Sequence, residues 1–227
     1  MRLPPPDRDP YSAWRGALAG PDFARDDTAL LVIDMQYLDA DWDSGMCLRA
    51  RQEGFETDLL YYRDRLGDII PNIRLLQDSF REKEAEVIFA TIASLTTDGR
   101  DRGAGHKSLG MHAPPGSREA EILDELKPVG DEIVLTKTTS SIFNGTAIER
   151  VLRNLGINNL IFSGVFTTNC VESSVRDASD LGFDCSVVED ACGALIEEMH
   201  VASIRALRNV YARVMTTGEV VEIIQGL

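Results

Sequence analysis

Three residues with the chemistry of a hydrolytic site each follow an apolar segment of the sequence: Asp34, Lys137 and Cys170. Short apolar segments of this kind are typical of buried parallel strands. Open α/β sheets form their ligand sites at the carboxyl ends of the strands, so the three side chains are expected to meet at one edge. Together they could attack a carbonyl carbon, because the carboxylate can take the thiol proton and later deliver it to a departing amine.

Cys170 has the most informative surroundings. Residues 160–162 are apolar and predict a strand, Gly164 permits backbone geometry that other residues resist, and residues 167–169 (Thr-Thr-Asn) are good N-cap types. Cys170 is therefore expected in the first turn of a helix, where the positive end of the helix dipole makes a thiol more nucleophilic at neutral pH. The alternative for a lone cysteine is a small, inert core residue.

The composition narrows the class of protein. The chain has 227 residues, a hydrophobic share of 44% and a formal net charge of −14, which argues against nucleic acid or an anionic membrane as a partner. No apolar run approaches the roughly 20 residues of a membrane span, and the amino terminus lacks a signal peptide, so a cytoplasmic location is expected. The four cysteines form no C-x-x-C pair, and glycine-rich nucleotide motifs are absent, so no cofactor is expected.

Apolar segments alternate with helical patterns along the chain, which predicts an α/β fold with a mostly parallel sheet covered on both faces. Residues 1–27 are expected to form an irregular arm and residues 28–227 a single domain. Six strands are predicted, at residues 29–33, 87–92, 132–136, 160–162, 184–188 and 212–215. Helices are predicted at residues 58–84, where Pro71 should bend or divide the helix, and at 117–126, 147–155, 170–182, 199–210 and 218–224. Residues 39–56 are expected to form a loop, and the loops at 37–56 and 93–116 are expected to supply the pocket walls.

Three segments, at residues 28–36, 135–143 and 164–171, resemble the motifs of the isochorismatase-like cysteine hydrolase superfamily, and the resemblance covers about residues 28–215. It implies a three-layer αβα fold with a six-stranded parallel sheet, and homodimers or homotetramers. It also implies Cys170 as the nucleophile, Asp34 as general base and acid, and Lys137 as their electrostatic partner. A cis peptide would precede Phe166, and the N–H groups of Phe166 and Cys170 would form an oxyanion hole.

The resemblance also implies a pocket, for which Gln36, Tyr37, Phe143 and Asn169 are the candidate substrate-binding residues. The family motif D-x-Q-x-D-F is altered here, since Asp39 is followed by Ala40, so the entrance to the site is expected to differ.

Metal ligands are not expected in this site. Nicotinamidases of the superfamily carry D-x-H ligands after the second strand, whereas residues 90–95 contain no histidine. His106 and His112, in the long loop at 93–116, are expected to be solvated.

The sequence therefore predicts a metal-independent amidohydrolase that acts on a small ureido, carbamoyl or related amide through a thioester on Cys170. Hydrolysis of a vinyl ether, as in true isochorismatases, is one alternative, and a nicotinamidase-like amidase is another. A binding subunit without catalysis is a third. Because true isochorismatases typically lack the nucleophilic cysteine, Cys170 favours a C–N bond as the target.

Overall fold

A six-stranded, fully parallel sheet forms the centre of the computed structural model, which describes residues 13, 14 and 16–227. The strand order is β3-β2-β1-β4-β5-β6, and every neighbouring pair is parallel. The strands are β1 Thr28–Ile33, β2 Glu86–Ile92, β3 Ile133–Lys137, β4 Asn159–Val165, β5 Asp184–Gly193 and β6 Arg213–Met215. All six predicted strands are confirmed, although β4 continues to Val165 and β5 to Gly193.

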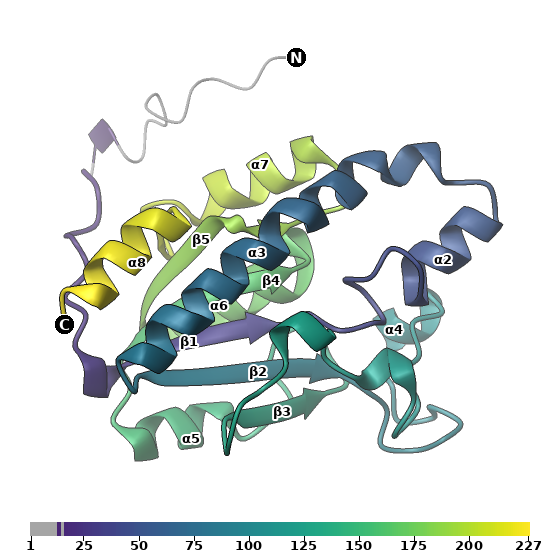
Figure 1. Ribbon diagram of the computed structural model, residues 1–227, viewed down its shortest axis with the longest axis horizontal. Coiled ribbons are helices and arrows are strands. Elements are labelled where there is room, and N and C mark those ends of the chain that lie inside the picture. The colour runs from purple at the N-terminus through teal and green to yellow at the C-terminus, as the bar shows by residue number, and fades with distance from the viewer. Residues whose placement is uncertain (1–12, 15) are drawn as a thin grey trace.

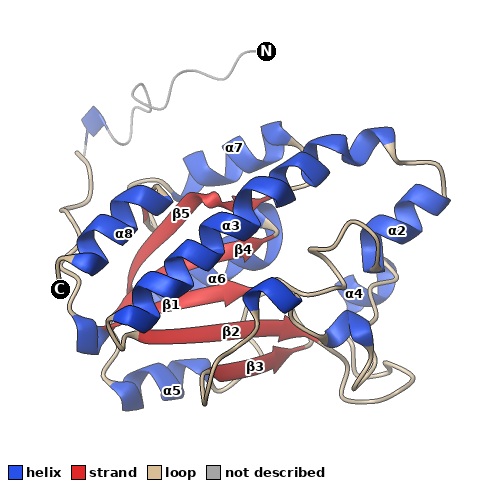
Figure 2. Ribbon diagram, viewed as in Figure 1, coloured by secondary structure: helices blue, strands red, loops and turns tan. Residues whose placement is uncertain are grey.

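Helices cover both faces of the sheet, which confirms the predicted three layers (Figures 1 and 2). The α-helices are α2 Gly45–Gln52, α3 Leu60–Glu82, α4 Ala104–Ser108, α5 Ile148–Leu155, α6 Glu172–Asp180, α7 Glu197–Leu207 and α8 Thr217–Gln225. Helices α3 and α8 share one buried cluster with the sheet, and α5, α6 and α7 share the other. No helix among the described residues is long and apolar enough to cross a membrane.

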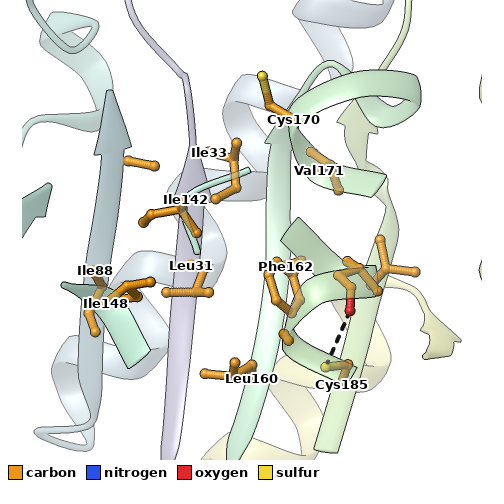
Figure 3. Close-up of a cluster of buried hydrophobic side chains, with 14 of the residues drawn as sticks. Leu31, Ile33, Ile88, Ile142, Ile148, Leu160, Phe162, Cys170, Val171 and Cys185 are labelled. Atoms are coloured by element: carbon orange, nitrogen blue, oxygen red, sulfur yellow. Dashed lines mark hydrogen bonds between the residues drawn. The ribbon is translucent and has the colours of Figure 1, made fainter. Parts of the chain in front are cut away.

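The two central strands are apolar on both sides because both of their faces are covered. Every residue of β1 and β4 is buried. Successive side chains of a strand point to opposite faces, so Leu31 and Phe162 pack on the α5–α6 side (Figure 3), whereas Leu30 and Ile161 pack under α3. Burial of alternate side chains on the two faces fixes the register of the strands, and the register determines where each strand ends relative to its neighbours.

Two backbone features bring the ends of β1 and β4 together. Gly164 has φ +109°, and a Cβ at this position would overlap the backbone of Ile33 in the neighbouring strand. Asp34 has φ +51°, a left-handed conformation that aspartate adopts more readily than most residues. The chain therefore turns sharply after β1 and leaves the Asp34 side chain at the carboxyl edge of the sheet.

Four predicted segments differ from the structure. The loop at 39–56 contains helix α2, which follows Ser44 and buries Cys47, and the loop at 93–116 contains the short helix α4. Pro71 lies inside an unbroken α3, whose apolar side packs against the sheet. The predicted helix at 117–126 consists of two 3-10 turns, at Arg118–Ala120 and Asp124–Leu126.

The predicted arm at residues 1–27 lies partly outside the described residues. Its described end contains a 3-10 turn, Arg25–Asp27, which leads directly into β1. The division into an arm and a single domain over residues 28–227 stays a prediction.

Candidate active site

Asp34 and Lys137 form a buried ion pair at the carboxyl edge of the sheet. Asp34 follows β1 and Lys137 ends β3, two strands away, and each side chain is no more than 1% exposed. Lys137 Nζ donates to Asp34 Oδ2 at 2.7 Å and to the Thr139 carbonyl at 3.1 Å. The sheet thus delivers an acidic and a basic group from residues 103 positions apart in the sequence.

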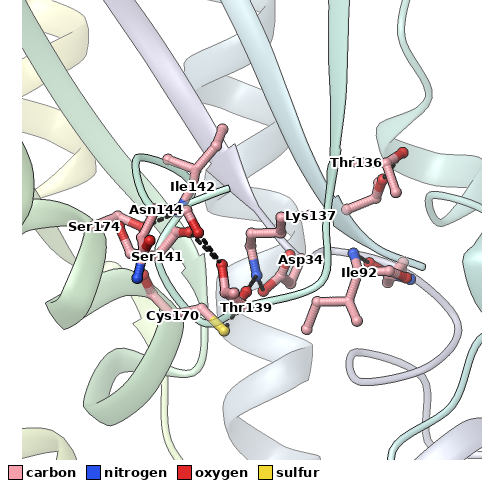
Figure 4. A network of polar contacts seen from close by, with 12 residues as sticks. Asp34, Ile92, Thr136, Lys137, Thr139, Ser141, Ile142, Asn144, Cys170 and Ser174 are labelled. Carbon is pink, nitrogen blue, oxygen red and sulfur yellow. Dashed lines mark hydrogen bonds and ion pairs between the residues drawn. The ribbon is translucent and has the colours of Figure 1, made fainter. Parts of the chain in front are cut away.

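Cys170 completes this group, as the sequence predicted for the carboxyl edge. Lys137 Nζ lies 3.4 Å from Cys170 Sγ, and Figure 4 shows the three side chains converging. Cys170 sits in a wide π-type turn, Thr167–Val171, that runs into α6. The peptide bond between Val165 and Phe166, just before this turn, is cis, as the resemblance implied.

Ser174 fixes the turn that carries Cys170. Its hydroxyl donates to the Cys170 carbonyl at 2.6 Å and accepts from the Ile142 N–H at 3.2 Å. One side chain therefore links the turn after β4 to the loop after β3, which holds Lys137 and Cys170 in fixed relation (Figure 4).

The electrostatics of the thiol differ from the sequence expectation. Burial raises the pKa of Cys170 well above its ordinary value, the Asp34 carboxylate raises it further, and Lys137 lowers it. The helix dipole is outweighed because Cys170 is only 5% exposed and faces a carboxylate. The resting side chain is therefore a neutral thiol that must lose its proton as it attacks.

Burial also shifts the pKa values of Asp34 and Lys137. Burial raises the pKa of Asp34, against the opposing effect of Lys137. Burial lowers the pKa of Lys137, but Asp34 and Cys170 outweigh it, and the net direction is upward. Among the described residues, Asp34 Oδ1 has no hydrogen-bond partner, so it is the oxygen available for a proton from the thiol.

A small cavity of about 60 Å³ opens onto Cys170. Its volume leaves room for only a few water-sized groups. It is lined by groups from three loops and the ends of the central strands: Asp34, Asp39, Ile92, Gly105, His106, Leu109, Met111, Ser140, Val165, Phe166, Asn169 and Cys170. The expectation that the loops at 37–56 and 93–116 supply the walls is confirmed by Asp39 and by Gly105, His106, Leu109 and Met111.

A second cavity of about 190 Å³ shares Leu109, Met111, Phe166 and Asn169 with the first. Its other walls come from α2, the turn at 167–171 and the segment that leads into α7: Met46, Arg49, Thr168, Leu195 and Met199. Most of these side chains are apolar. The two cavities therefore form a small chamber at Cys170, which contains the polar groups of Asp34, Asp39 and His106, and a wider apolar space beside it.

Asn169, one of the four predicted substrate-binding residues, lines both cavities, and the other three line neither. The Gln36 amide is used by the backbone: its Oε1 accepts from the Ile92 N–H, and its Nε2 donates to the Ile92 and Glu119 carbonyls. Gln36 therefore fixes the chain at the end of β2, and the structure corrects its predicted place.

Tyr37 and Phe143 are also placed away from Cys170. The Tyr37 ring lies 3.6 Å under the Arg118 guanidinium, and its hydroxyl accepts from a backbone N–H. The Phe143 ring packs 5.9 Å from the ring of Phe183, beside a separate surface depression. Both positions follow a predicted strand closely in sequence, but their side chains turn away from the edge.

Three polar residues that line the chamber were not predicted as site residues: Asp39, His106 and Ser140. Asp39 is 1% exposed and His106 is 7% exposed, and both line the cavity at Cys170. The expectation of a solvated His106 is wrong, because α4 turns the ring inward. His112 is partly buried beside Ser94 Oγ, 3.2 Å away. No sequence signal marked Asp39 beyond its departure from the family motif, since a charged loop residue is usually solvated.

Metal-ligating side chains do not gather in the described part of the chain: it holds no group of three or more histidine, cysteine, aspartate or glutamate residues placed to bind an ion.

Comparison with known proteins agrees with this arrangement. The model of the isochorismatase domain matches residues 28–219. Over 111 residues the chain is 38% identical to the ureidoacrylate amidohydrolase RutB of Acinetobacter baylyi, a match that spans 48% of the chain and 45% of that protein. RutB of Serratia proteamaculans is 30% identical over 185 residues, which span 74% of the chain and 71% of that protein.

The fold has close relatives among solved structures. A cysteine hydrolase from Pseudomonas syringae pv. phaseolicola superposes with a TM-score of 0.77 at 21% identity, covering 92% of this chain and 99% of that one. The matched domain extends from the first residue of β1 into α8 and includes Asp34, Lys137 and Cys170. The protein therefore belongs to the isochorismatase family.

Proposed function

We propose that this protein is an amidohydrolase that cleaves a C–N bond in a small ureido, carbamoyl or related amide, with Cys170 as the nucleophile. The observation that carries the proposal is the buried contact of a carboxylate, an ammonium and a thiol at one cavity, with Lys137 Nζ 2.7 Å from Asp34 Oδ2 and 3.4 Å from Cys170 Sγ. The matches to RutB proteins, whose name states an amidohydrolase activity, support this bond class.

The first half of the reaction forms a thioester. Asp34 Oδ1 takes the thiol proton as Sγ attacks the carbonyl carbon, and the carbonyl oxygen becomes an oxyanion. The C–N bond then breaks, and the departing ammonia or amine takes the proton from Asp34. Burial raises the pKa of both groups, so the site favours the neutral thiol before the transfer and the neutral carboxyl after it.

Backbone N–H groups of Phe166 and Cys170 are proposed to stabilise the oxyanion. Both belong to the segment that follows β4, whose start is fixed by the close approach of Gly164 to Ile33. Donors that are already in place when negative charge develops need no reorganisation, and each typically contributes a factor of about 100 or more to the rate.

The second half releases the acid. Asp34 takes a proton from water, the hydroxide attacks the thioester carbon, and the C–S bond breaks to restore the thiol with the proton held by Asp34. Lys137 keeps its contacts to Asp34 and Cys170 in both halves, so its role is to hold the two groups in place and to stabilise negative charge on either.

Ammonia release across a panel of amides tests the proposal. The panel contains biuret, ureidoacrylate, N-carbamoyl amino acids, nicotinamide and simple aliphatic amides, each with and without chelator. We expect release from one class of compound, insensitive to chelator, and absent in Cys170→Ala and Cys170→Ser proteins that keep the melting temperature of the wild type.

Near wild-type turnover in the Cys170→Ala protein would contradict the mechanism. Release of pyruvate from isochorismate that survives the loss of Cys170 would replace it with ether hydrolysis. No turnover of any compound by the folded wild-type protein, isochorismate included, would favour a binding subunit.

A further inference from the structure

The chamber at Cys170 contains a second carboxyl group that the proposed reaction does not use. Asp39 is 1% exposed, and among the described residues its Oδ1 has no hydrogen-bond partner. Its backbone is held on both sides, since Asp39 N–H donates to the Gln36 carbonyl at 3.1 Å and the Tyr62 hydroxyl donates to the Asp39 carbonyl at 2.7 Å. A buried carboxyl oxygen without a partner is costly, so this atom is available to a ligand.

His106 presents a second open polar atom to the same chamber. The ring is 7% exposed, and its Nδ1 is buried without a hydrogen-bond partner in the part of the chain that the structure describes. Burial, together with the charge of Lys137, lowers the pKa of His106, so the ring is neutral near pH 7. A neutral imidazole has one donor and one acceptor nitrogen.

The charges around the chamber determine what it can bind. No lysine or arginine is among the residues that line it. Lys137 lies behind it, and its ammonium has three N–H donors, which contact Asp34, the Thr139 carbonyl and Cys170. A carboxylate beside Asp39 would therefore have no free cation to pair with.

Asp39 itself favours an uncharged partner. Burial and the nearby Asp34 raise the pKa of Asp39 to about 8, so the group is largely protonated at neutral pH and offers both a donor and an acceptor. Together with His106, the chamber holds matched donors and acceptors and no net positive charge, which is the complement of an amide or ureide rather than of an acid.

We propose that Asp39 and His106 form the recognition end of the chamber and select an uncharged amide or ureide group over a ligand that places a carboxylate there. The inference rests on the proposed role of Cys170 as the reactive thiol, and it names the class of group that this site admits. A carboxylate farther out in the substrate, in the space lined by Arg49, is compatible with it.

Two alkylating reagents of nearly identical shape test this selection without requiring turnover. Iodoacetamide carries an uncharged amide and iodoacetate carries a carboxylate, and each loses iodide when Sγ attacks its methylene carbon. The rates at Cys170 are measured by peptide mass spectrometry and divided by the rates with free cysteine. We expect the wild type to prefer iodoacetamide by about tenfold or more relative to free cysteine, the effect of one or two hydrogen bonds.

Substitutions of Asp39 and of His106, which lie on separate loops, test whether these residues cause the preference for iodoacetamide. Asp39→Leu and His106→Leu should each lower this preference several-fold, while Asp39→Asn and His106→Gln, which keep a donor and an acceptor, should largely retain it. Asp43→Leu is the matched control, because Asp43 lies in the same loop with a side chain that is 83% exposed. If one leucine variant fails to fold, the other decides.

An unchanged preference in a folded Asp39→Leu or His106→Leu protein would overturn the inference. In the second arm, oxamide is compared with oxamate, whose carboxylate adjoins the amide carbon, and we expect a higher kcat/KM for oxamide. No ammonia from either compound or from the wider panel, with the alkylation preference intact, would reject the proposed hydrolysis and leave the recognition inference standing.

Discussion

Two buried polar groups lie near the turn that carries Cys170, one at the cavity and one away from it, and they differ in how many of their polar atoms have hydrogen-bond partners. On the cavity side, Asp34 Oδ1, Asp39 Oδ1 and His106 Nδ1 have no hydrogen-bond partner among the described residues. On the far side, His200 Nδ1 lies 2.9 Å from Thr167 Oγ1, and His200 Nε2 lies 3.3 Å from Arg65 Nη2.

The contacts of His200 determine which of its ring nitrogens carries the proton. Arg65 can only donate, so His200 Nε2 is the acceptor and the ring proton is on Nδ1, directed at Thr167. Arg65 also donates to the Cys192 and Glu189 carbonyls of β5. The two groups therefore differ: polar atoms of the first are open to the cavity, whereas both ring nitrogens of His200 have partners.

The largest effect should come from Cys170→Ala, which removes the nucleophile without opening a charged group. We expect at least a thousandfold loss of kcat, in line with the loss of a covalent nucleophile. The free energy of unfolding should change by less than about 1 kcal/mol, since the substitution removes only one buried sulfur atom. Steady-state kinetics and chemical denaturation measure the two quantities. A destabilised variant would show that the cavity side also holds the fold.

Lys137→Met should impair both activity and folding, because it leaves the Asp34 carboxyl buried without its cation. Breaking a buried ion pair by removing one partner typically costs about 3–5 kcal/mol, and protonation of Asp34 will reduce this loss. We also expect slower alkylation of Cys170 at neutral pH, because Lys137 lowers the pKa of the thiol. Asp34→Asn with Lys137→Met is the matched double variant and should recover part of the stability. An unchanged pH dependence of alkylation would contradict the role of Lys137.

His200→Gln tests the contacts of His200 through the pH dependence of the unfolding free energy. Burial and Arg65 lower the pKa of His200 to about 4, while an unfolded histidine has a pKa near 6.5. The unfolded chain therefore binds the proton more readily below pH 6.5, and the stability contributed by neutral His200 is lost as the pH falls from about 6.5 toward 4. At pH 5 this loss is about 2 kcal/mol.

The measurement is the difference in unfolding free energy between wild type and His200→Gln at pH 7.5 and pH 5. Taking the difference cancels groups that titrate in both proteins, such as Asp39, whose raised pKa acts in the opposite direction. We expect the wild-type advantage at pH 7.5 to shrink at pH 5, with kcat at pH 7.5 within a few-fold of wild type. A constant difference would show that His200 does not titrate in this range.

The smallest effect should follow Ser174→Ala, because Ser174 links the turn that carries Cys170 to the loop after β3. Loss of the bonds to the Cys170 carbonyl and the Ile142 N–H should cost about 1–2 kcal/mol. The looser turn should lower kcat several-fold and leave KM nearly unchanged, because Ser174 does not line the cavity. Ser174→Thr keeps the hydroxyl and serves as the control. Equal kcat in the alanine variant would show that the turn is fixed without this residue.

The sequence predicted the sheet and the reactive group for the same physical reason. Strands buried on both faces are apolar throughout, so β1, β2 and β4 could be recognised, and the residues after parallel strands must share one edge. The sequence alone therefore predicts that Asp34, Lys137 and Cys170 lie close together. Gly164 could be identified as a position of unusual backbone geometry, although its close approach to Ile33 could not.

The walls of the chamber could not be predicted because loop side chains have no periodic pattern. Gln36 and Tyr37 are closer to β1 in sequence than Asp39 is, yet of the three only Asp39 lines the cavity. The direction of each depends on long-range contacts, such as those from Gln36 to Ile92 and Glu119. His106 appeared solvated because its burial depends on α4, a helix of only five residues.

The strand order has a consequence for folding kinetics. Lys137 reaches the site on β3, an edge strand that pairs only with β2, while Asp34 and Cys170 come from the adjacent central strands β1 and β4. Contacts between residues 33 and 103 positions apart form only after much of the chain has been ordered. Recovery of a reactive Cys170 during refolding should therefore follow the docking of β3, and local opening of this edge would inactivate the enzyme while its core remained folded.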